Sequence, residues 1–296
     1  MRRIDRSDVG SSPFPLCETM MKTVTLPDGE TVPALGQGTW MMGERHVRRA
    51  DEIAALRVGV ECGMTLIDTA EMYGEGAAET LIGEALGDVR DHLFLVSKAY
   101  PQNASRKRLA GACEASLKRL GTDRLDLYLL HWRGSVPLAE TAEAMEALKS
   151  AGKIRHWGVS NLDTHDMEEL VAEGGGACAT NQILYNLTRR GAEHDLLPWL
   201  AEHGMPVMAY SPVEQGRLLG DRTLAATASR IGATPAQVAL AWAMRHDGVI
   251  AIPKAGSDVH VRENRAAADL VLSDADLATL DTAFPRPRAR RPLEML

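Results

Sequence analysis

The sequence has no excess of positive charge and no paired cysteines. Its 33 Lys and Arg residues are outnumbered by 40 Asp and Glu residues, for a formal net charge of −7. This balance does not favour nucleic acid or an anionic membrane as a partner. The four cysteines are far apart and form no C-x-x-C pair: Cys17, Cys62, Cys113 and Cys178. Neither a disulfide framework nor a zinc site is suggested, which suits a reducing cytosol, and no bound metal is predicted.

The sequence also lacks a long apolar run. No segment is apolar over enough residues to cross a membrane, and the charged N-terminus has no apolar core of the kind found in secretory signals. We therefore expect a soluble, cytoplasmic protein, and we expect it to be a monomer. Residues 1–21 are expected to form a disordered leader, since Met20 and Met21 directly precede the first patterned segment.

What the sequence does contain is a regular alternation of strand-like and helix-like segments. The strands are predicted at Leu35–Thr39, Thr65–Asp68, Leu93–Ser97, Leu125–His131, Ile154–Val159, Ala179–Gln182, Val207–Tyr210 and Val249–Ile252. The helices between and after them are predicted at Arg49–Cys62, Ala78–Leu86, Arg106–Leu120, Leu138–Ala151, Asp163–Ala172, Glu193–His203, Thr234–Arg245 and Val259–Ala268. Strict alternation implies parallel strands covered by crossover helices, and eight such units predict an α/β fold of the (β/α)8 TIM barrel type.

The ends of the chain complete this domain plan. Lys22–Val32 is predicted to be an N-terminal β-hairpin that closes the bottom of the barrel, because Pro27-Asp28-Gly29 supplies turn chemistry. A doubly wound sheet is the alternative, but no G-x-G-x-x-G motif opens any helix. No linker or repeat divides the chain, so residues 22–285 are predicted to be one barrel domain. Residues 286–296, with arginines among prolines, are predicted to be a solvated tail.

Polar or aromatic side chains stand at the ends of most predicted strands. They are Asp68, Lys98, His131 with Trp132, Ser160 with Asn161, Asn181 with Gln182, Tyr210 with Ser211, and Lys254. Each has a structural reading of its own: Lys98 alone would be a solvated strand end, and His131 alone a core histidine. In a barrel of this kind, however, chemistry is found at the carboxyl ends of the strands. Their convergence on one face therefore indicates a site.

Asp68, Tyr73, Lys98 and His131 together suggest acid–base chemistry. Asp68 alone could cap the next helix, and Tyr73, in a glycine-bearing turn, could be a rim aromatic. A nearby ammonium, however, lowers the pKa of a phenol, which is about 10 in model compounds. A carboxylate offsets the cost of burying that ammonium, and an imidazole can orient a substrate oxygen. Such a set suits carbonyl reduction, in which the oxygen gains charge as hydride arrives at carbon.

Six motifs, in order between about residues 22 and 285, resemble the aldo-keto reductase superfamily, in particular its prokaryotic methylglyoxal-reductase-like members. They are Asp68-Thr69-Ala70-Glu71-Met72-Tyr73-Gly74, the Lys98 strand end, Leu129-Leu130-His131-Trp132, Gly158-Val159-Ser160-Asn161, Ala209-Tyr210-Ser211-Pro212 and Ile252-Pro253-Lys254. The resemblance implies that Tyr73 donates the proton. It also implies that Lys98 and Asp68 tune this tyrosine and that His131 orients the substrate.

The same resemblance implies a nicotinamide cofactor along the barrel mouth. Its carboxamide would be held by Ser160, Asn161 and Gln182, and its ring would stack on Tyr210. The pyrophosphate would lie along residues 211–217, where the implied contacts are Ser211, Val213, Gln215, Gly216 and Arg217. Backbone amides and an arginine are suited to neutralise phosphate oxygens, and an aromatic face orients the ring for hydride transfer. Tyr210 and Arg217 alone would read as core packing and an ordinary surface arginine.

The adenosine end departs from the commonest family pattern. The implied contacts there are Lys254, Ser257, His260 and Asn264. Ala255 follows Lys254 where many members have Ser or Thr, and His260 stands where an arginine often covers the 2′-phosphate. Loss of that guanidinium fork weakens bidentate phosphate recognition. We predict a preference for NADPH, with NADH open as an alternative.

The substrate pocket is predicted from Trp40 and from Trp132 beside His131. Apolar walls over a polar catalytic pair are typical of ligand pockets, although Trp40 alone would read as core packing. The loop Trp132–Pro137 and the tail are short. We therefore expect an open site that takes small aldehydes and dicarbonyls, such as methylglyoxal and aromatic aldehydes.

Three other functions stay open at this point. A cofactor-holding sensor or subunit would share the barrel and the four residues but show little turnover. A metal-dependent hydrolase of the same fold would need several histidines at the barrel mouth, whereas only His131 lies at a predicted strand end. An alcohol dehydrogenase working in the oxidative direction would use the same residues.

Overall fold

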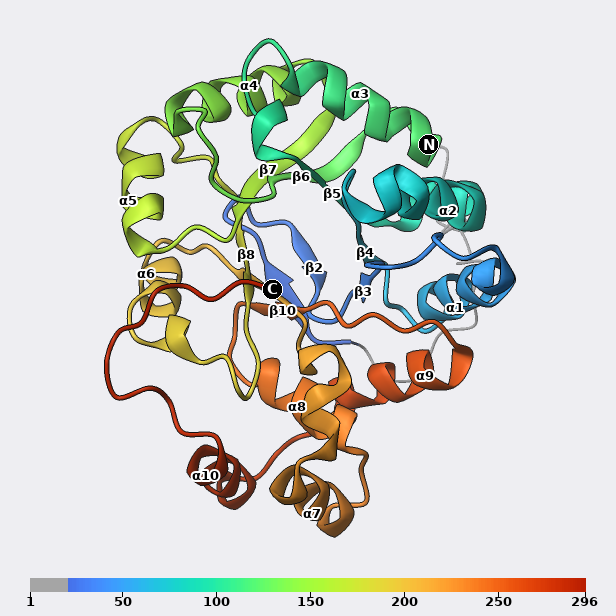
Figure 1. Ribbon diagram of the computed structural model, residues 1–296, viewed down its shortest axis with the longest axis vertical. Coiled ribbons are helices and arrows are strands. Elements are labelled where there is room, and N and C mark those ends of the chain that lie inside the picture. Colours follow the sequence, from blue (N-terminus) through green and yellow to red (C-terminus); the bar gives the residue numbers. More distant parts are fainter. Residues whose placement is uncertain (1–20) are drawn as a thin grey trace, which may run out of the picture.

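Eight parallel strands form a ring at the centre of the protein, whose computed structural model describes residues 21–296 (Figure 1). The strands are β3 (Gln37–Gly38), β4 (Leu66–Asp68), β5 (Phe94–Ala99), β6 (Leu125–Leu130), β7 (Ile154–Ser160), β8 (Asn181–Leu184), β9 (Val207–Tyr210) and β10 (Val249–Ala251). They pair in chain order from β3 to β10. Parallel bridges from Leu35 to Ala251 and from Gly38 to Lys254 join the first strand to the last. This closure confirms the predicted (β/α)8 barrel.

Glycine is required where the ring closes. A Cβ atom on Gly38 would lie 2.7 Å from the carbonyl oxygen of Ile252, which is closer than real Cβ contacts. The Gly38 amide instead donates to the carbonyl oxygen of Pro253 at 3.0 Å. The backbone of β3 can therefore approach the end of β10 only without a side chain at this position.

The helices surround the ring (Figure 1). They are α1 (Arg49–Glu61), α2 (Ala77–Leu86), α3 (Leu109–Leu120), α4 (Leu138–Ser150), α5 (Thr164–Ala172), α6 (Leu196–Glu202), α7 (Arg222–Arg230), α8 (Pro235–Ala243), α9 (Asp258–Ala266) and α10 (Asp274–Ala283). Within the described chain, none of these helices is long and apolar enough to span a membrane.

The strands distribute their side chains between two cores. Phe94 and Val96 of β5 belong to the same apolar cluster as Val24 of the N-terminal segment, whereas Leu95 packs with residues from the helices. This alternation is the two-residue period of a strand. Lys98 is two residues after Val96 and four after Phe94, so its side chain lies on the same face of the strand, toward the interior of the ring.

A β-hairpin precedes the barrel, as predicted. Strands β1 (Thr23–Thr25) and β2 (Thr31–Pro33) pair antiparallel, with Val24 opposite Val32. The hairpin is tied to the amino end of β7, because Glu30 lies 2.7 Å from both the Arg155 guanidinium and His156 Nε2. The predicted leader, residues 1–21, lies outside the described residues except for Met21. Met21 packs against the apolar cluster that contains Val24, Phe94 and Val96.

Two helices, α7 and α10, are absent from the sequence prediction. The α7 segment is mostly polar or small and buries only Leu224, Thr227 and Ala228, so it offers few apolar residues for a sequence pattern although these three lie on one face. The α10 helix follows the eight repeating units, but a helix-start motif in the sequence could have predicted it. Ser273 and Asp276 form a reciprocal capping box there.

The C-terminal tail differs from the predicted solvated segment. Most of its side chains are exposed, yet Leu293 packs against the apolar cluster that contains Leu95 and residues of the helices. Arg290 pairs with Asp195 at 2.7 Å, and Glu294 pairs with Arg189 at 2.6 Å. The tail runs from α10 past α6 and ends over the strand ring, near β8 and β10 (Figure 1). Its sequence contains no periodic pattern from which this path could be predicted.

Candidate active site

Asp68, Lys98 and Tyr73 form a chain of contacts at the carboxyl ends of β4 and β5. The Lys98 ammonium donates to Asp68 Oδ2 at 2.8 Å, to the carbonyl oxygen of Thr69 at 2.7 Å and to Tyr73 Oη at 3.2 Å. The other carboxylate oxygen, Asp68 Oδ1, accepts from Gln182 Nε2 at 2.8 Å. Lys98 and Asp68 are both buried. A buried ion pair is tolerated when its remaining hydrogen-bonding positions are filled, as they are here.

The protonation of Tyr73 follows from burial more than from Lys98. Burial raises the pKa of Tyr73, Lys98 lowers it and Asp68 raises it again, so that it lies above the usual value of a phenol. Burial also lowers the pKa of Lys98, but Asp68 and Tyr73 outweigh this effect and raise it above its usual value. The lowering of the Tyr73 pKa expected from the sequence is therefore present but outweighed. At neutral pH the phenol keeps its proton and the ammonium its charge.

His131, one residue after β6, faces Tyr73 in an edge-to-face arrangement with ring centroids 5.9 Å apart. Burial, reinforced by the charge of Lys98, lowers the pKa of His131 to about 3. The imidazole is therefore neutral at neutral pH. Its Nδ1 is buried and has no hydrogen-bond partner within residues 21–296.

The turn that carries Tyr73 is held from both sides. Glu71 Oε1 accepts from the Tyr100 amide at 2.6 Å and from Asn103 Nδ2 at 3.0 Å, which ties the turn to the loop after β5. After Tyr73 the backbone enters the left-handed region, with φ of 55° at Gly74 and 91° at Gly76. Glycine adopts this conformation without steric cost. Glu71, which had no predicted role, thus positions the turn.

A cavity of about 980 Å³ lies at this end of the barrel and brings most of the predicted site residues together. Those that line it are Trp40, Asp68, Tyr73, His131, Trp132, Ser160, Asn161, Gln182, Tyr210, Ser211, Val213, Gln215, Gly216, Lys254, Ser257, His260 and Asn264. Lys98 is buried behind Tyr73 and does not line it, and neither does Arg217.

The predicted carboxamide contacts are already connected to one another. Ser160 Oγ donates to the carbonyl oxygen of Gln182 at 2.8 Å, and Asn161 Nδ2 donates to that of His131 at 3.1 Å. The Tyr210 hydroxyl donates to Asn161 Oδ1 at 3.0 Å. Strand β8 extends to Leu184, so Gln182 lies within the strand and not at its end as predicted. The Ser160 hydroxyl, the Asn161 amide and the Tyr210 hydroxyl are thus joined by hydrogen bonds, whereas the Gln182 amide donates to Asp68 Oδ1.

The loop after β9 has an unusual backbone. Ser211, Glu214 and Gln215 have φ of 48°, 51° and 55°, and Gly216 has φ of 87°. Left-handed residues other than glycine are strained and are concentrated at functional sites. The Arg217 guanidinium donates to Glu214 Oε1 at 2.9 Å and to Gln215 Oε1 at 3.1 Å. A direct contact between Arg217 and a phosphate stays a prediction.

The predicted adenosine end includes the cation Lys254 and the acidic group Glu263 among the described residues. Lys254 is exposed at the cavity, and no ion pair is found for it in the described part of the chain. His260 Nδ1 lies 3.0 Å from Glu263 Oε2. Glu263 also lines the cavity and is absent from the sequence prediction. A carboxylate at this position opposes a 2′-phosphate, whereas Lys254 attracts it.

The walls near Tyr73 are apolar and include residues that were not predicted. Trp40 is 42% exposed and lines the cavity, so the core-packing reading of this residue is wrong. Trp132 packs edge to face against Tyr100, with centroids 5.9 Å apart. Met295 and Leu296 at the end of the tail also line the cavity, and nothing in their local sequence indicates this position.

Sequence comparison finds close relatives over nearly the whole chain. The model of the aldo/keto reductase family matches residues 34–284. The methylglyoxal reductase YeaE of Escherichia coli is 53% identical over 281 residues, which cover 93% of this chain and 99% of that protein.

Structural comparison finds the same barrel in solved structures. An aldo/keto reductase from Klebsiella pneumoniae, in complex with NADP and acetate, superposes with a TM-score of 0.91 at 52% identity and covers 94% of this chain and 100% of its own. An aldo-keto reductase from the same organism in complex with NADPH gives the same values. The chain therefore belongs to the aldo/keto reductase family and is an NAD(P)H-dependent oxidoreductase.

Proposed function

We propose that the protein reduces small aldehydes and dicarbonyls, such as methylglyoxal and aromatic aldehydes, to alcohols with NADPH, and that Tyr73 is the proton donor. The observation that carries this proposal is the contact of a protonated Tyr73 hydroxyl with the buried Lys98–Asp68 pair at the wall of the cavity. Relatives named as methylglyoxal reductases and structures crystallised with NADP and NADPH support the substrate class and the cofactor.

The residues around the cavity fit this cofactor. The predicted adenosine end offers Lys254 as a cation, and the left-handed backbone of residues 214–216 is the kind of segment whose amides can face phosphate oxygens. The middle offers the connected Ser160 hydroxyl and Asn161 amide, with Ser160 donating to the Gln182 carbonyl oxygen. When bound, NADPH supplies hydride to the carbonyl carbon of the substrate. The catalytic residues then have to supply one proton to the carbonyl oxygen.

Tyr73 supplies that proton in the proposed reaction. As the carbon–hydrogen bond forms, the electron pair of the carbonyl π bond moves to oxygen and takes the phenolic proton. The resulting phenolate is stabilised by the Lys98 ammonium, 3.2 Å from Tyr73 Oη. Neutral His131 donates a hydrogen bond that orients the carbonyl oxygen before transfer. Because the Tyr73 pKa is raised, the protonated form required for reduction dominates at neutral pH.

The test is the Tyr73→Phe variant beside the wild type. The variant keeps the ring but loses the acid, so we expect NADPH to bind with unchanged affinity, measured by fluorescence titration. We expect kcat for methylglyoxal to fall by at least about 100-fold, the usual contribution of a general acid. Turnover that survives in this variant would refute the assignment of Tyr73. A wild type that binds NADPH without reducing aldehydes would instead favour the sensor function.

A monomeric state and a cytoplasmic location stay predictions from the sequence. Gel filtration with light scattering measures the first, and fractionation of the source cells measures the second. Neither enters the proposed chemistry.

A further inference from the structure

A buried carboxylate lies beneath the strained loop that follows β9. Glu214 is 4% exposed, and its side chain accepts hydrogen bonds from Asn186 Nδ2 at 2.8 Å and from Arg189 at 2.7 Å. Burial alone would raise the pKa of Glu214, but these donors and Arg217 hold it at about 2. The carboxylate is therefore charged and anchored at neutral pH. This anchoring keeps Glu214 and Gln215 in their left-handed conformation.

Arg189 joins this loop to the C-terminal tail. Its Nε and NH2 donate to Glu214 Oε1, at 3.2 and 2.7 Å, while its NH1 donates to Glu294 Oε1 at 2.6 Å. A planar guanidinium holds two carboxylates in a fixed relative geometry, which a lysine does not. One side chain from the segment after β8 thus binds both the predicted cofactor loop and the tail.

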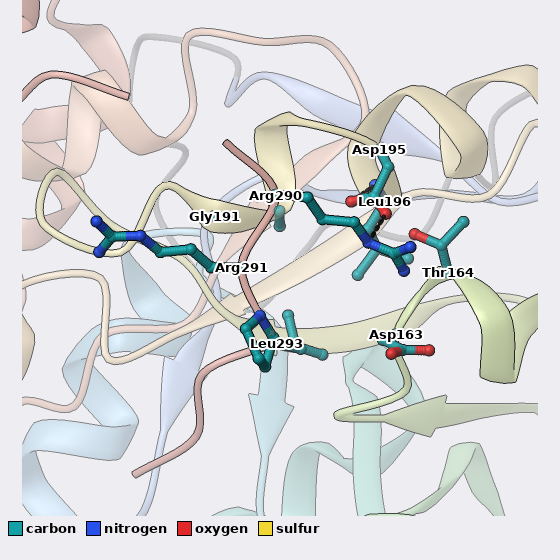
Figure 2. Close-up of a pocket in the computed structure, with 10 residues that line it drawn as sticks. Asp163, Thr164, Gly191, Asp195, Leu196, Arg290, Arg291 and Leu293 are labelled. Atoms are coloured by element: carbon teal, nitrogen blue, oxygen red, sulfur yellow. Dashed lines mark hydrogen bonds and ion pairs between the residues drawn. The ribbon is translucent and has the colours of Figure 1, made fainter. Parts of the chain in front are cut away.

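Polar contacts hold the tail in place beside one apolar contact. A cavity of about 410 Å³ lies beneath residues 290–293, between the tail and the segment that begins α6 (Figure 2). Arg290 crosses this cavity to Asp195, whereas the exposed Arg291, which also lines it, extends in the opposite direction (Figure 2). Leu293 supplies the apolar contact of this stretch with the core. Loss of one ion pair is therefore expected to release the tail locally.

The end of the tail lies where substrate is expected to bind. Met295 and Leu296 line the same cavity as Tyr73 and His131. Tyr210, the residue predicted to stack on the nicotinamide, lines this cavity as well. The tail therefore touches both the predicted cofactor site and the wall of the substrate pocket.

We propose that Arg189 is a positioning residue that couples the cofactor loop to the tail. Through it, cofactor binding at residues 213–217 fixes Met295 and Leu296 as a wall of the substrate pocket. This inference rests on the proposed function, because it assigns the loop to the cofactor and the tail to the substrate. It gives a purely electrostatic link, Glu214–Arg189–Glu294, between two sites that bind different molecules.

Hydrogen–deuterium exchange of the full chain, with and without NADPH, tests the link. In the wild type we expect NADPH to slow amide exchange both in residues 211–218 and in residues 286–296. In Glu294→Gln we expect NADPH to slow amide exchange in residues 211–218 but not in residues 286–296. Arg189→Met should lose the tail response as well. Arg291→Gln removes an exposed charge from the same tail and is the matched control, with a response like that of the wild type.

Steady-state kinetics provide a second readout, which loss of packing alone would not reproduce. Glu294→Gln should raise the KM for methylglyoxal at least about 5-fold while the dissociation constant of NADPH stays unchanged, a factor typical of coupled sites. Glu214→Gln should instead weaken NADPH binding. The coupling would be overturned if NADPH did not slow amide exchange of residues 286–296 in the wild type, or if it still slowed that exchange in Glu294→Gln. A wild type that binds NADPH but reduces no aldehyde would refute the proposed function alone, since the exchange experiment needs only cofactor binding.

Discussion

The Lys98 ammonium lies 2.8 Å from the Asp68 carboxylate, and both side chains are shielded from solvent inside the barrel mouth. Each charge is compensated chiefly by the other, because water cannot replace a missing partner there. Gln182 and the carbonyl oxygen of Thr69 fill further hydrogen-bonding positions of the pair. The pair is therefore a structural unit, and removal of one member has different consequences for stability from removal of both.

Lys98→Met is expected to destabilise the fold by about 3–5 kcal/mol, because it leaves Asp68 charged and unpaired in the interior. Asp68→Asn combined with Lys98→Met should cost less than the sum of the two single substitutions, since no lone charge remains. Urea unfolding of the three variants measures this. All three should lose carbonyl reduction. Additive losses of stability would show that the two charges do not depend on each other.

The pH profile of reduction follows from two pKa shifts of opposite direction. His131 has its pKa lowered to about 3, so it stays neutral at higher pH and contributes no change near the usual histidine pKa of about 6.5. In the proposed reaction Tyr73 acts as the acid and must be protonated, and since its pKa is raised, activity is lost only above the usual phenol pKa of about 10. We expect kcat for methylglyoxal to be level between about pH 5 and 9.

Initial rates at saturating NADPH, corrected for cofactor decay in acid, measure this profile. His131→Gln serves as the control, because it should lower kcat without changing the shape of the curve. A limb centred near the usual histidine pKa of about 6.5 in the wild type, and absent from this variant, would contradict the assignment of a neutral His131.

The strand-end residues could be predicted because the barrel brings the carboxyl ends of its strands to one face. Asp68, Lys98 and His131 needed only the position of each strand, which short β-favouring runs indicate. The contribution of burial to the Tyr73 pKa could not be predicted, because it depends on packing from several elements at once. Met295 and Leu296 were missed for a related reason. A non-periodic tail is placed by distant partners such as Arg189, which no local pattern identifies.

Cofactor preference should depend on the balance between Lys254 and Glu263. Lys254 has no ion-pair partner in the described chain and faces the cavity, so Lys254→Met is expected to raise the KM for NADPH about 10-fold, the usual effect of one charge-assisted hydrogen bond. The KM for NADH should change little, since it lacks the 2′-phosphate. Glu263→Gln should act in the opposite direction and lower the KM for NADPH. Equal effects on the two cofactors would place the 2′-phosphate elsewhere.

The last prediction concerns Trp40 in the apolar wall of the cavity. Trp40 lines the cavity and is 42% exposed, so its truncation removes contact area for a ligand without opening the core. We expect Trp40→Ala to leave the stability within about 0.5 kcal/mol of the wild type, as is usual for exposed positions. The KM should rise about 10-fold for an aromatic aldehyde, since ring contacts of this kind contribute about 1 kcal/mol or more beyond their buried area. Methylglyoxal is too small to contact the same surface, so its KM should be nearly unchanged.

A panel of aldehydes of increasing size, assayed with both proteins, measures this dependence. A uniform rise for all substrates would instead place Trp40 beside the reacting carbonyl.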